Sequence, residues 1–189
     1  MPMLNPTLSW RAAASAILLL AASASVTAQP YGFGRTATAQ AITAWNIDID
    51  ALGNGLPPGR GTVAEGEQLF SQQCAACHGA KGQGGPADAL VGGTDLKRFN
   101  PKKTVGNFWP YATTLYDFIQ RAMPYNTPQS LKASEVYALT AWILHKNDLL
   151  AADAELDAIS LPKVQMSNRL GFVRDSRPDT ANTACKECR

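Results

Sequence analysis

Apolar side chains recur at helical spacing in two segments of the chain, and both segments are predicted to be α-helices. The first opens with Thr62-Val63-Ala64-Glu65, a capping box that satisfies free backbone groups of a first helical turn. Five residues then follow one another at steps of three or four, which places them on one side of a helix: Val63, Gly66, Phe70, Cys74 and Cys77. The second covers about residues 133–146 and has a broad apolar stripe: Val136, Leu139, Trp142 and Ile143.

A glycine within the first helix predicts where the two helices meet. Glycine costs about 1 kcal/mol relative to alanine in a helix interior, so Gly66 indicates a close helix crossing. We expect the second helix to cross there, with the large Trp142 ring over Gly66. The start of the second helix is ambiguous, because Lys132 stands where a capping Ser or Thr is expected; Ser130 and Ser134 are the substitutes.

The remaining segments predict a single all-α domain with an extension at each end. A shorter helix is expected from Thr113 to Arg121, after a glycine-rich loop that runs from Gly79 to Gly93. The N-terminal extension, residues 29–61, is predicted to hold a short helix capped by Thr38, an arm that packs on the domain, and a turn-rich linker. The domain itself is assigned to residues 62–150 and the C-terminal extension to residues 151–189.

Residues 1–28 have the three parts of an export signal. Arg11 supplies the positive charge, residues 12–22 form a short apolar run, and Val26-Thr27-Ala28 resembles a cleavage site. The apolar run is too short to span a bilayer, although an uncleaved N-terminal anchor is the alternative. No later segment is long and apolar enough to span, so we expect a periplasmic protein with no stable membrane span after signal removal.

The overall charge of the chain excludes one class of binding partner, nucleic acid, and says little about others. The chain has 17 basic and 15 acidic residues, so it has no basic field suited to a polyanion. Any docking surface must therefore come from a local patch.

The segment Cys74-Ala75-Ala76-Cys77-His78 carries the chemistry. Cys-x-x-Cys-His is the attachment signature of a c-type haem, in which each thiol forms a thioether to one vinyl group. The histidine that follows is then held beneath the iron as its proximal ligand. Two structural cysteines beside an unrelated histidine are the alternative, which an exported chain disfavours. We expect one covalently bound haem c on Cys74, Cys77 and His78.

Several polar groups are candidates for supporting this haem. The backbone carbonyl of Pro86, in the glycine-rich loop, is a candidate acceptor for the free imidazole N–H of the haem-bound histidine, although a plain turn proline is the alternative. Asn107, Trp109 and Tyr111 carry polar hydrogens that can reach haem propionates, and they are equally compatible with core positions.

Three residues are candidates for the second axial ligand. Met123 is favoured, because Pro124 stops the preceding helix and leaves the thioether on a stiff loop. Met166, in the C-terminal extension, and His145, on the second long helix, are the alternatives. His/Met ligation raises the reduction potential and closes the iron on both faces, so the predicted chemistry is transfer of single electrons.

The chain ends in a second cysteine pair, Cys185-Lys186-Glu187-Cys188-Arg189. Arginine stands where a haem motif requires histidine, so a second haem is not expected. In an oxidising compartment a disulfide is favoured, while a redox-active thiol pair, a metal site and a link to a partner are the alternatives.

The order of these parts resembles class I cytochromes c. The resemblance covers about residues 62–150, and Cys74, Cys77, His78 and Met123 match that family's haem-binding positions. It implies the class I cytochrome c fold, in which helices pack around one covalently bound haem.

A narrower resemblance is carried by four stretches: Trp45-Asn46-Ile47-Asp48, Gly55-Leu56-Pro57-Pro58-Gly59, residues 103–114 and residues 135–141. They are similar to the cytochrome subunits of periplasmic molybdenum sulfite dehydrogenases and of the sulfur-oxidising system. This likeness implies a molybdenum dehydrogenase as electron donor and a downstream cytochrome or oxidase as acceptor. Some members of the sulfur-oxidising group carry two haems, whereas this chain has one complete motif.

Two other functions compete with an electron-transfer subunit. One is a freestanding carrier for another periplasmic dehydrogenase. The other is a haem enzyme or gas sensor with a displaceable sixth ligand, which Met123 disfavours.

Overall fold

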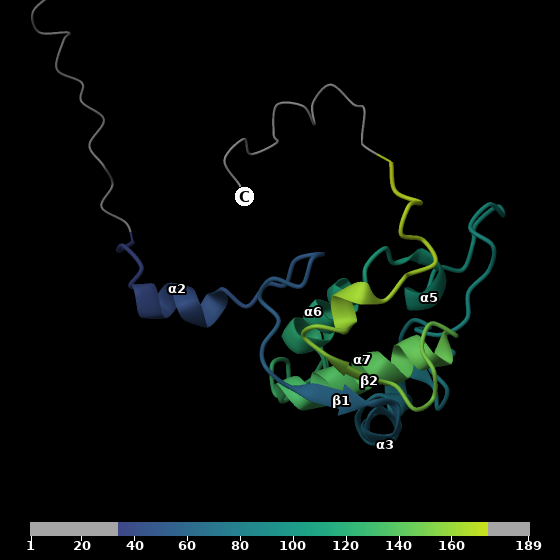
Figure 1. Ribbon diagram of the computed structural model, residues 1–189, viewed down its shortest axis with the longest axis horizontal. Helices are drawn as coiled ribbons and strands as arrows, with labels where there is room; N and C mark the ends of the chain where they lie inside the picture. Colours follow the sequence, from purple (N-terminus) through teal and green to yellow (C-terminus); the bar gives the residue numbers. More distant parts are fainter. Residues whose placement is uncertain (1–33, 174–189) are drawn as a thin grey trace, which may run out of the picture. The chain divides into compact units, whose positions relative to one another are not determined.

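The computed structural model describes residues 34–173, and these form a mainly helical structure (Figure 1). The leader predicted at residues 1–28 and the Cys185/Cys188 pair lie outside the described residues. The elements, in order, are α2 (Ala39–Trp45), β1 (Arg60–Thr62), α3 (Val63–Gln73), α4 (Ala75–His78), α5 (Val105–Phe108), α6 (Ala112–Ala122), α7 (Ala133–Lys146), β2 (Glu155–Asp157) and the 3₁₀ turn η2 (Leu161–Lys163). The helical class expected from the sequence is confirmed.

The predicted capping box opens α3. Thr62 Oγ1 accepts a hydrogen bond from the backbone N–H of Glu65, and the Glu65 carboxylate accepts one from the Thr62 backbone N–H at 2.8 Å. The Thr62 hydroxyl also donates to the Glu65 carboxylate at 2.8 Å, and the two bonds that this carboxylate accepts lower the pKa of Glu65. The helix buries Val63, Gly66 and Phe70, the face that the spacing indicated.

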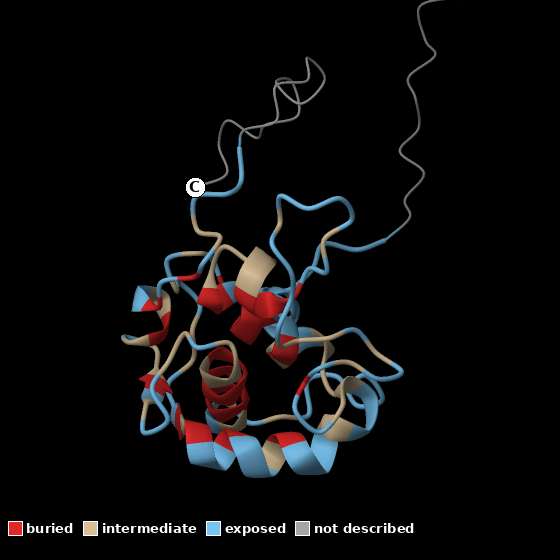
Figure 2. Cartoon of the chain, turned by 90° about the vertical axis from the view of Figure 1, so that its right-hand side faces the viewer, coloured by how far each residue is buried: buried red, intermediate tan, exposed pale blue. Residues whose placement is uncertain are grey.

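Helix α7 is the centre of the fold and contacts both α3 and α6. It is more deeply buried than its apolar stripe suggested, because all residues from 136 to 144 are buried. In Figure 2 α7, seen nearly end-on, is coloured as buried, whereas α3, along the lower edge, has an exposed outer side. The start of α7 differs from expectation: neither Ser130 nor Ser134 caps it. Lys132 occupies the N-cap position, and its backbone N–H donates to the Glu135 carboxylate at 2.7 Å.

Helices α3 and α7 cross at Gly66, as its position predicted. A Cβ placed on Gly66 would lie 2.0 Å from the Ala138 carbonyl oxygen and 2.7 Å from Trp142 Cβ. The Trp142 ring itself stacks on Phe70, with ring centroids 4.0 Å apart. Glycine therefore brings the two backbones together, and the neighbouring aromatic pair fills the space beside the crossing.

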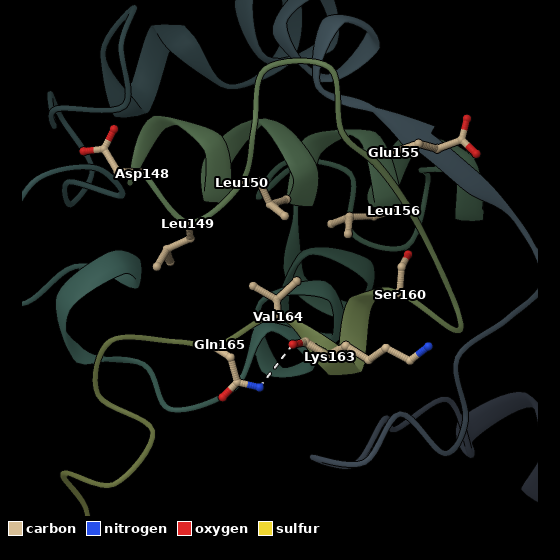
Figure 3. Close-up of a pocket in the computed structure, with 9 residues that line it drawn as sticks. All are labelled: Asp148, Leu149, Leu150, Glu155, Leu156, Ser160, Lys163, Val164 and Gln165. Carbon is tan, nitrogen blue, oxygen red and sulfur yellow. Dashed lines mark hydrogen bonds between the residues drawn. The ribbon is translucent and has the colours of Figure 1, made fainter.

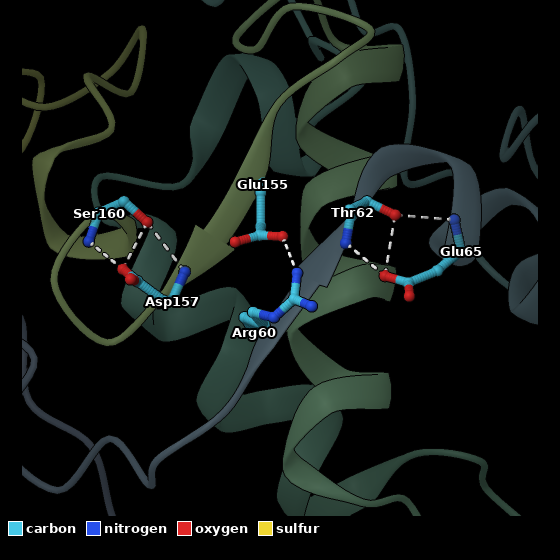
Figure 4. Close-up of polar contacts among 6 residues, drawn as sticks. All are labelled: Arg60, Thr62, Glu65, Glu155, Asp157 and Ser160. Atoms are coloured by element: carbon cyan, nitrogen blue, oxygen red, sulfur yellow. Dashed lines mark hydrogen bonds and ion pairs between the residues drawn. The ribbon is translucent and has the colours of Figure 1, made fainter.

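A two-stranded sheet closes the base of the fold, where the sequence indicated only a turn-rich linker. β1 and β2 pair antiparallel, with Gly61 opposite Leu156. Figure 4 shows the polar contacts around it, including the ion pair of Arg60 with Glu155 on the neighbouring strand. β1 lies directly on α7, because a Cβ on Gly61 would come within 2.2 Å of the Ala138 backbone nitrogen.

Both extensions contribute side chains to the core of residues 62–150. From the N-terminal side, Ile49 is buried, and its backbone N–H donates to the buried Asp117 carboxylate at 3.0 Å. From the C-terminal side, four residues join the same core: Leu156, Leu161, Val164 and Met166. The expected arm therefore packs from Ile49 onward, whereas α2 buries no residue and Trp45 is 85% exposed. The boundaries at 61/62 and 150/151 stay a prediction.

Within residues 34–173, none of the helices is long and apolar enough to cross a membrane.

Candidate haem-binding site

An apolar cavity of about 640 Å³ lies between α3, α4, α6 and α7. This volume is in the range of cofactor sites, about 300–1,000 Å³. Its walls come from residues far apart in the sequence, including Phe70, Leu115, Ile119, Leu139 and Ile143. Cys74, Cys77, His78 and Met123 all line it. The cavity therefore brings together all four predicted haem-binding residues.

A break between α3 and α4 presents the two thiols. Cys74 ends α3, where its N–H donates to the Phe70 carbonyl at 2.9 Å, and α4 then makes a single turn to His78. Burial, and secondarily the Cys77 thiol, raises the pKa of Cys74 to about 11. Cys74 is half-buried and Cys77 is exposed, and both are free thiols. One thiol therefore lies in the cavity wall and the other at its rim.

The His78 ring is held by the Asp88 backbone carbonyl, and the expectation for Pro86 is wrong. His78 Nδ1 lies 2.7 Å from the Asp88 oxygen. A carbonyl only accepts, so Nδ1 carries a proton, and in the neutral tautomer that this contact selects the lone pair is on Nε2. The backbone N–H of Ala87 donates to the Cys77 carbonyl at 2.9 Å, and this bond turns the loop so that Asp88 reaches the imidazole. Pro86 lies in the cavity wall instead.

Of the three candidates for the second axial ligand, Met123 lines the cavity together with His78, whereas Met166 and His145 do not. Met123 follows the last residue of α6 and its N–H donates to the Ile119 carbonyl at 3.0 Å. Met166 is 3% exposed and belongs to the core. His145 Nδ1 lies 3.0 Å from the Leu150 carbonyl oxygen, at the end of α7.

The three residues considered as hydrogen-bond donors to the haem propionates occupy different positions. Asn107 is fully engaged elsewhere, since its Nδ2 donates to the Thr94 and Lys102 carbonyls at 2.7 and 2.9 Å; the propionate expectation for it is wrong. Tyr111 does not line the cavity, and its ring lies under the Arg169 guanidinium at 4.5 Å. Trp109 does line the cavity, edge-on to Phe118.

A second, open hollow of about 510 Å³ lies between the end of α7 and η2 (Figure 3). Its floor is formed by aliphatic side chains and its rim by Asp148, Glu155 and Lys163. It contains no thiol, thioether or imidazole, so it has none of the donors that hold haem. In the described residues, no group of three or more His, Cys, Asp or Glu side chains is arranged to bind a bare metal ion.

The site's residues fit a haem, judged by their donor set and their surroundings. Two thiols, one imidazole with a free Nε2 and one thioether border a single cavity whose walls are mainly apolar. The residue that sequence reasoning missed is Asp88, because it acts through a backbone carbonyl that every residue type carries.

Two comparisons with known proteins found similarity. A family model described as cytochrome c matches residues 63–147. The chain is also similar to a chain in the crystal structure of the sulfane dehydrogenase SoxCD from Paracoccus pantotrophus. The TM-score is 0.72 at 36% sequence identity, over 85% of this chain and 81% of that chain. A comparison with curated proteins gave no match.

Proposed function

The chain belongs to the cytochrome c family, and from this premise we propose that it is a periplasmic monohaem carrier that accepts single electrons from a molybdenum dehydrogenase of the sulfite-oxidising type. Family membership makes it a haem protein of electron transfer, with covalently attached haem c. The number of haems, the ligands, the compartment and the donor are the parts that we propose.

We assign the covalent bonds to Cys74 and Cys77 and the proximal bond to His78. Each thiol would form a thioether to one vinyl group of the haem. The Asp88 carbonyl, 2.7 Å from Nδ1, fixes the imidazole tautomer that leaves Nε2 free for iron. Because this acceptor is a backbone atom in a loop bonded to Cys77, the ring orientation is set by the same segment that attaches the cofactor.

We assign the sixth position to Met123. A thioether is a neutral, soft donor that favours the reduced iron and raises the potential. Haem bound in this way supplies one-electron chemistry, and the chain supplies ligands, burial and exclusion of water. The walls at Phe70, Leu139 and Ile143 are apolar, so water has few partners inside the cavity.

One observation carries the proposal: His78 and Met123, which are distant in sequence, line the same apolar cavity as both thiols. A haem enzyme or sensor needs an accessible iron, and a methionine positioned at the cavity argues against it. We therefore favour a carrier.

The proposed donor rests on two likenesses. Four stretches resemble cytochrome subunits of molybdenum sulfite dehydrogenases, and the similar solved structure is that of a sulfane dehydrogenase. The residues that carry the first likeness include Trp45-Asn46-Ile47-Asp48 and Gly55-Leu56-Pro57-Pro58-Gly59. Both stretches lie outside the haem motif, so they are not explained by haem binding alone.

The test is a visible spectrum of the protein, gently purified from its native periplasm, before and after addition of sulfite. Recombinant haem-loaded cytochrome serves as the control. We expect fast haem reduction in the native preparation only, because the dehydrogenase travels with it. Absence of reduction in both preparations would contradict the sulfite-type donor and favour a freestanding carrier for another dehydrogenase.

Haem stoichiometry is tested at the second cysteine pair. Replacing Cys185 or Cys188 with Ser should leave haem content unchanged at one per chain, because this pair has no following histidine. A haemochrome assay measures the content, and Cys77→Ser is the positive control for loss of covalent attachment. A lower haem content in either tail variant would contradict the assignment of one haem to Cys74 and Cys77.

A further inference from the structure

A basic loop, residues 94–104, stands out on a chain of nearly balanced charge. Within its eleven residues it carries four exposed cations and one acid: Lys97, Arg98, Lys102, Lys103 and Asp95. The loop's formal charge of +3 exceeds that of the whole chain, which is +2. In the part of the chain that the structure describes, none of these cations forms a salt bridge.

The loop is closed at its base and projects from the body of the protein. The Thr94 N–H donates to the Lys102 carbonyl at 3.1 Å, and the Lys102 N–H donates to Thr94 Oγ1 at 2.8 Å. Asn107, on α5, donates to the carbonyls of both residues. Figure 1 shows the loop extending away from α5. The base is therefore held in place while the tip faces solvent.

The tip carries a fully exposed aromatic ring. Phe99 is 103% exposed, and Arg98 precedes it. Asn100 follows with a positive φ of 50°, which turns the backbone directly after the ring. An exposed phenyl group among cations is costly in water and favourable where apolar and anionic groups occur together.

Residues 169–173 extend this surface. Three of their apolar side chains are exposed: Leu170 (93%), Phe172 (55%) and Val173 (90%). Phe108 links the two parts, because Lys103 Nζ lies 4.5 Å above its ring and Phe172 packs edge-on against it at 5.2 Å. Arg169 adds a fifth cation. We call these residues, together with the basic loop, the interfacial surface.

We propose that the interfacial surface binds the headgroups of an anionic phospholipid membrane, with Phe99 inserted among them. Phe99 stands alone at the tip of the projecting loop, so it needs its own apolar surroundings, which a fluid lipid layer supplies without a preformed pocket. A specific protein partner would instead need a complementary face, which in stable interfaces typically measures roughly 800 Å² on each side. Basic residues beside exposed apolar groups are the general chemistry of attachment to anionic bilayers.

The test is co-sedimentation of the exported, haem-loaded protein with lipid vesicles. Equimolar phosphatidylglycerol and phosphatidylcholine vesicles are compared with pure phosphatidylcholine vesicles, at low salt and at about 0.5 M NaCl, where charges are strongly screened. We expect binding to the anionic vesicles only, and release by salt.

Variants locate the binding. Lys97→Gln/Arg98→Gln should reduce partitioning roughly thirtyfold, at about fivefold for each charge. Phe99→Ser should reduce it about tenfold. Lys81→Gln/Lys163→Gln removes the same charge from exposed positions elsewhere and should change partitioning less than threefold. The haem spectrum and circular dichroism of each variant confirm that it is folded.

Three outcomes would overturn the proposal. The first is no binding of the parent protein to anionic vesicles. The second is that the Lys81→Gln/Lys163→Gln control loses as much vesicle binding as Lys97→Gln/Arg98→Gln. The third is that Lys97→Gln/Arg98→Gln and Phe99→Ser both bind vesicles as well as the parent does. Unchanged vesicle binding together with slower sulfite-dependent reduction in the Lys97→Gln/Arg98→Gln variant would assign the surface to an acidic protein instead. This inference does not depend on the electron donor, so its failure would leave the proposed electron transfer intact.

Discussion

Replacing Gly66 with alanine tests the helix crossing that positions the haem-binding segment. The new Cβ would lie 2.0 Å from the Ala138 carbonyl oxygen and 2.7 Å from Trp142 Cβ, whereas ordinary contacts are 3.4–4 Å. Because the nearest atoms are backbone, α3 and α7 must move apart by more than an ångström. Neither helix can do so without disturbing the stacked pair of Phe70 and Trp142.

The magnitude follows from two opposing effects. Overpacking of this kind costs about 1–3 kcal/mol, with the backbone clash favouring the upper end, and lost contacts around the crossing add to it. Alanine regains about 1 kcal/mol of helix propensity. We therefore expect Gly66→Ala to lower the free energy of unfolding by about 2 kcal/mol.

Guanidinium unfolding of the haem-loaded protein, followed by circular dichroism and by haem absorbance, measures this change. The control is Glu67→Ala, one position along α3 on its exposed side, which should stay within about 0.5 kcal/mol of the parent. If Gly66→Ala were as stable as the control, the crossing would not be tight and the reasoning would be refuted.

Three further predictions concern the axial ligand, the helix cap and the buried tyrosines. Met123→Ala should lower the reduction potential and let carbon monoxide bind the ferrous protein, and potentiometry and carbon monoxide titration measure these two changes. The control is the core substitution Met166→Leu, which should leave the haem spectrum unchanged. An unaltered spectrum in Met123→Ala would mean that another residue is the sixth ligand. Thr62→Ala removes the side-chain cap of α3 and should cost about 1 kcal/mol in denaturant unfolding; no loss would mean that the cap is dispensable. Burial raises the pKa of Tyr116, and raises that of Tyr137 to about 12, from the ordinary value of 10.0. The folded state keeps these protons where the unfolded chain loses them, so the two tyrosines' contribution to stability should be constant well below pH 10 and fall as the pH rises from 10 towards 12. Tyr137→Phe should make the loss of stability above pH 10 less steep. It should also lower the free energy of unfolding at pH 7 by about 1 kcal/mol, because the hydrogen bond to the Pro57 carbonyl is lost. If the loss above pH 10 were as steep as in the parent, Tyr137 would not be its cause.

Local patterns predicted the helices well, because their signals lie within one or two turns. The capping box at Thr62 marked the start of α3, and the apolar stripe marked α7 at the residues where it occurs. The helix expected at 113–121 is α6, one residue longer at each end. The haem motif and the Met123-Pro124 step are also local, so the candidate ligands were visible in the sequence.

What the sequence did not predict depends on contacts between distant or backbone groups. The sheet pairs residues 60–62 with residues 155–157, and neither short strand has an apolar repeat that would have marked it. The acceptor for His78 is a carbonyl, which gives no sequence signal, so a proline was a reasonable but wrong candidate.

The residue types and spacings along the chain thus determined the cofactor chemistry and the helical class. The tertiary structure decided which methionine faces the cavity, which carbonyl holds the histidine, and that Phe172 packs against Phe108 beside the basic loop. Met123 and Met166 have the same side chain, and only their packing separates them: one borders the cavity, and the other is enclosed in the core. The physical reason is that chemical identity is a property of each residue alone, whereas burial and orientation depend on all the neighbours that the folded chain brings together.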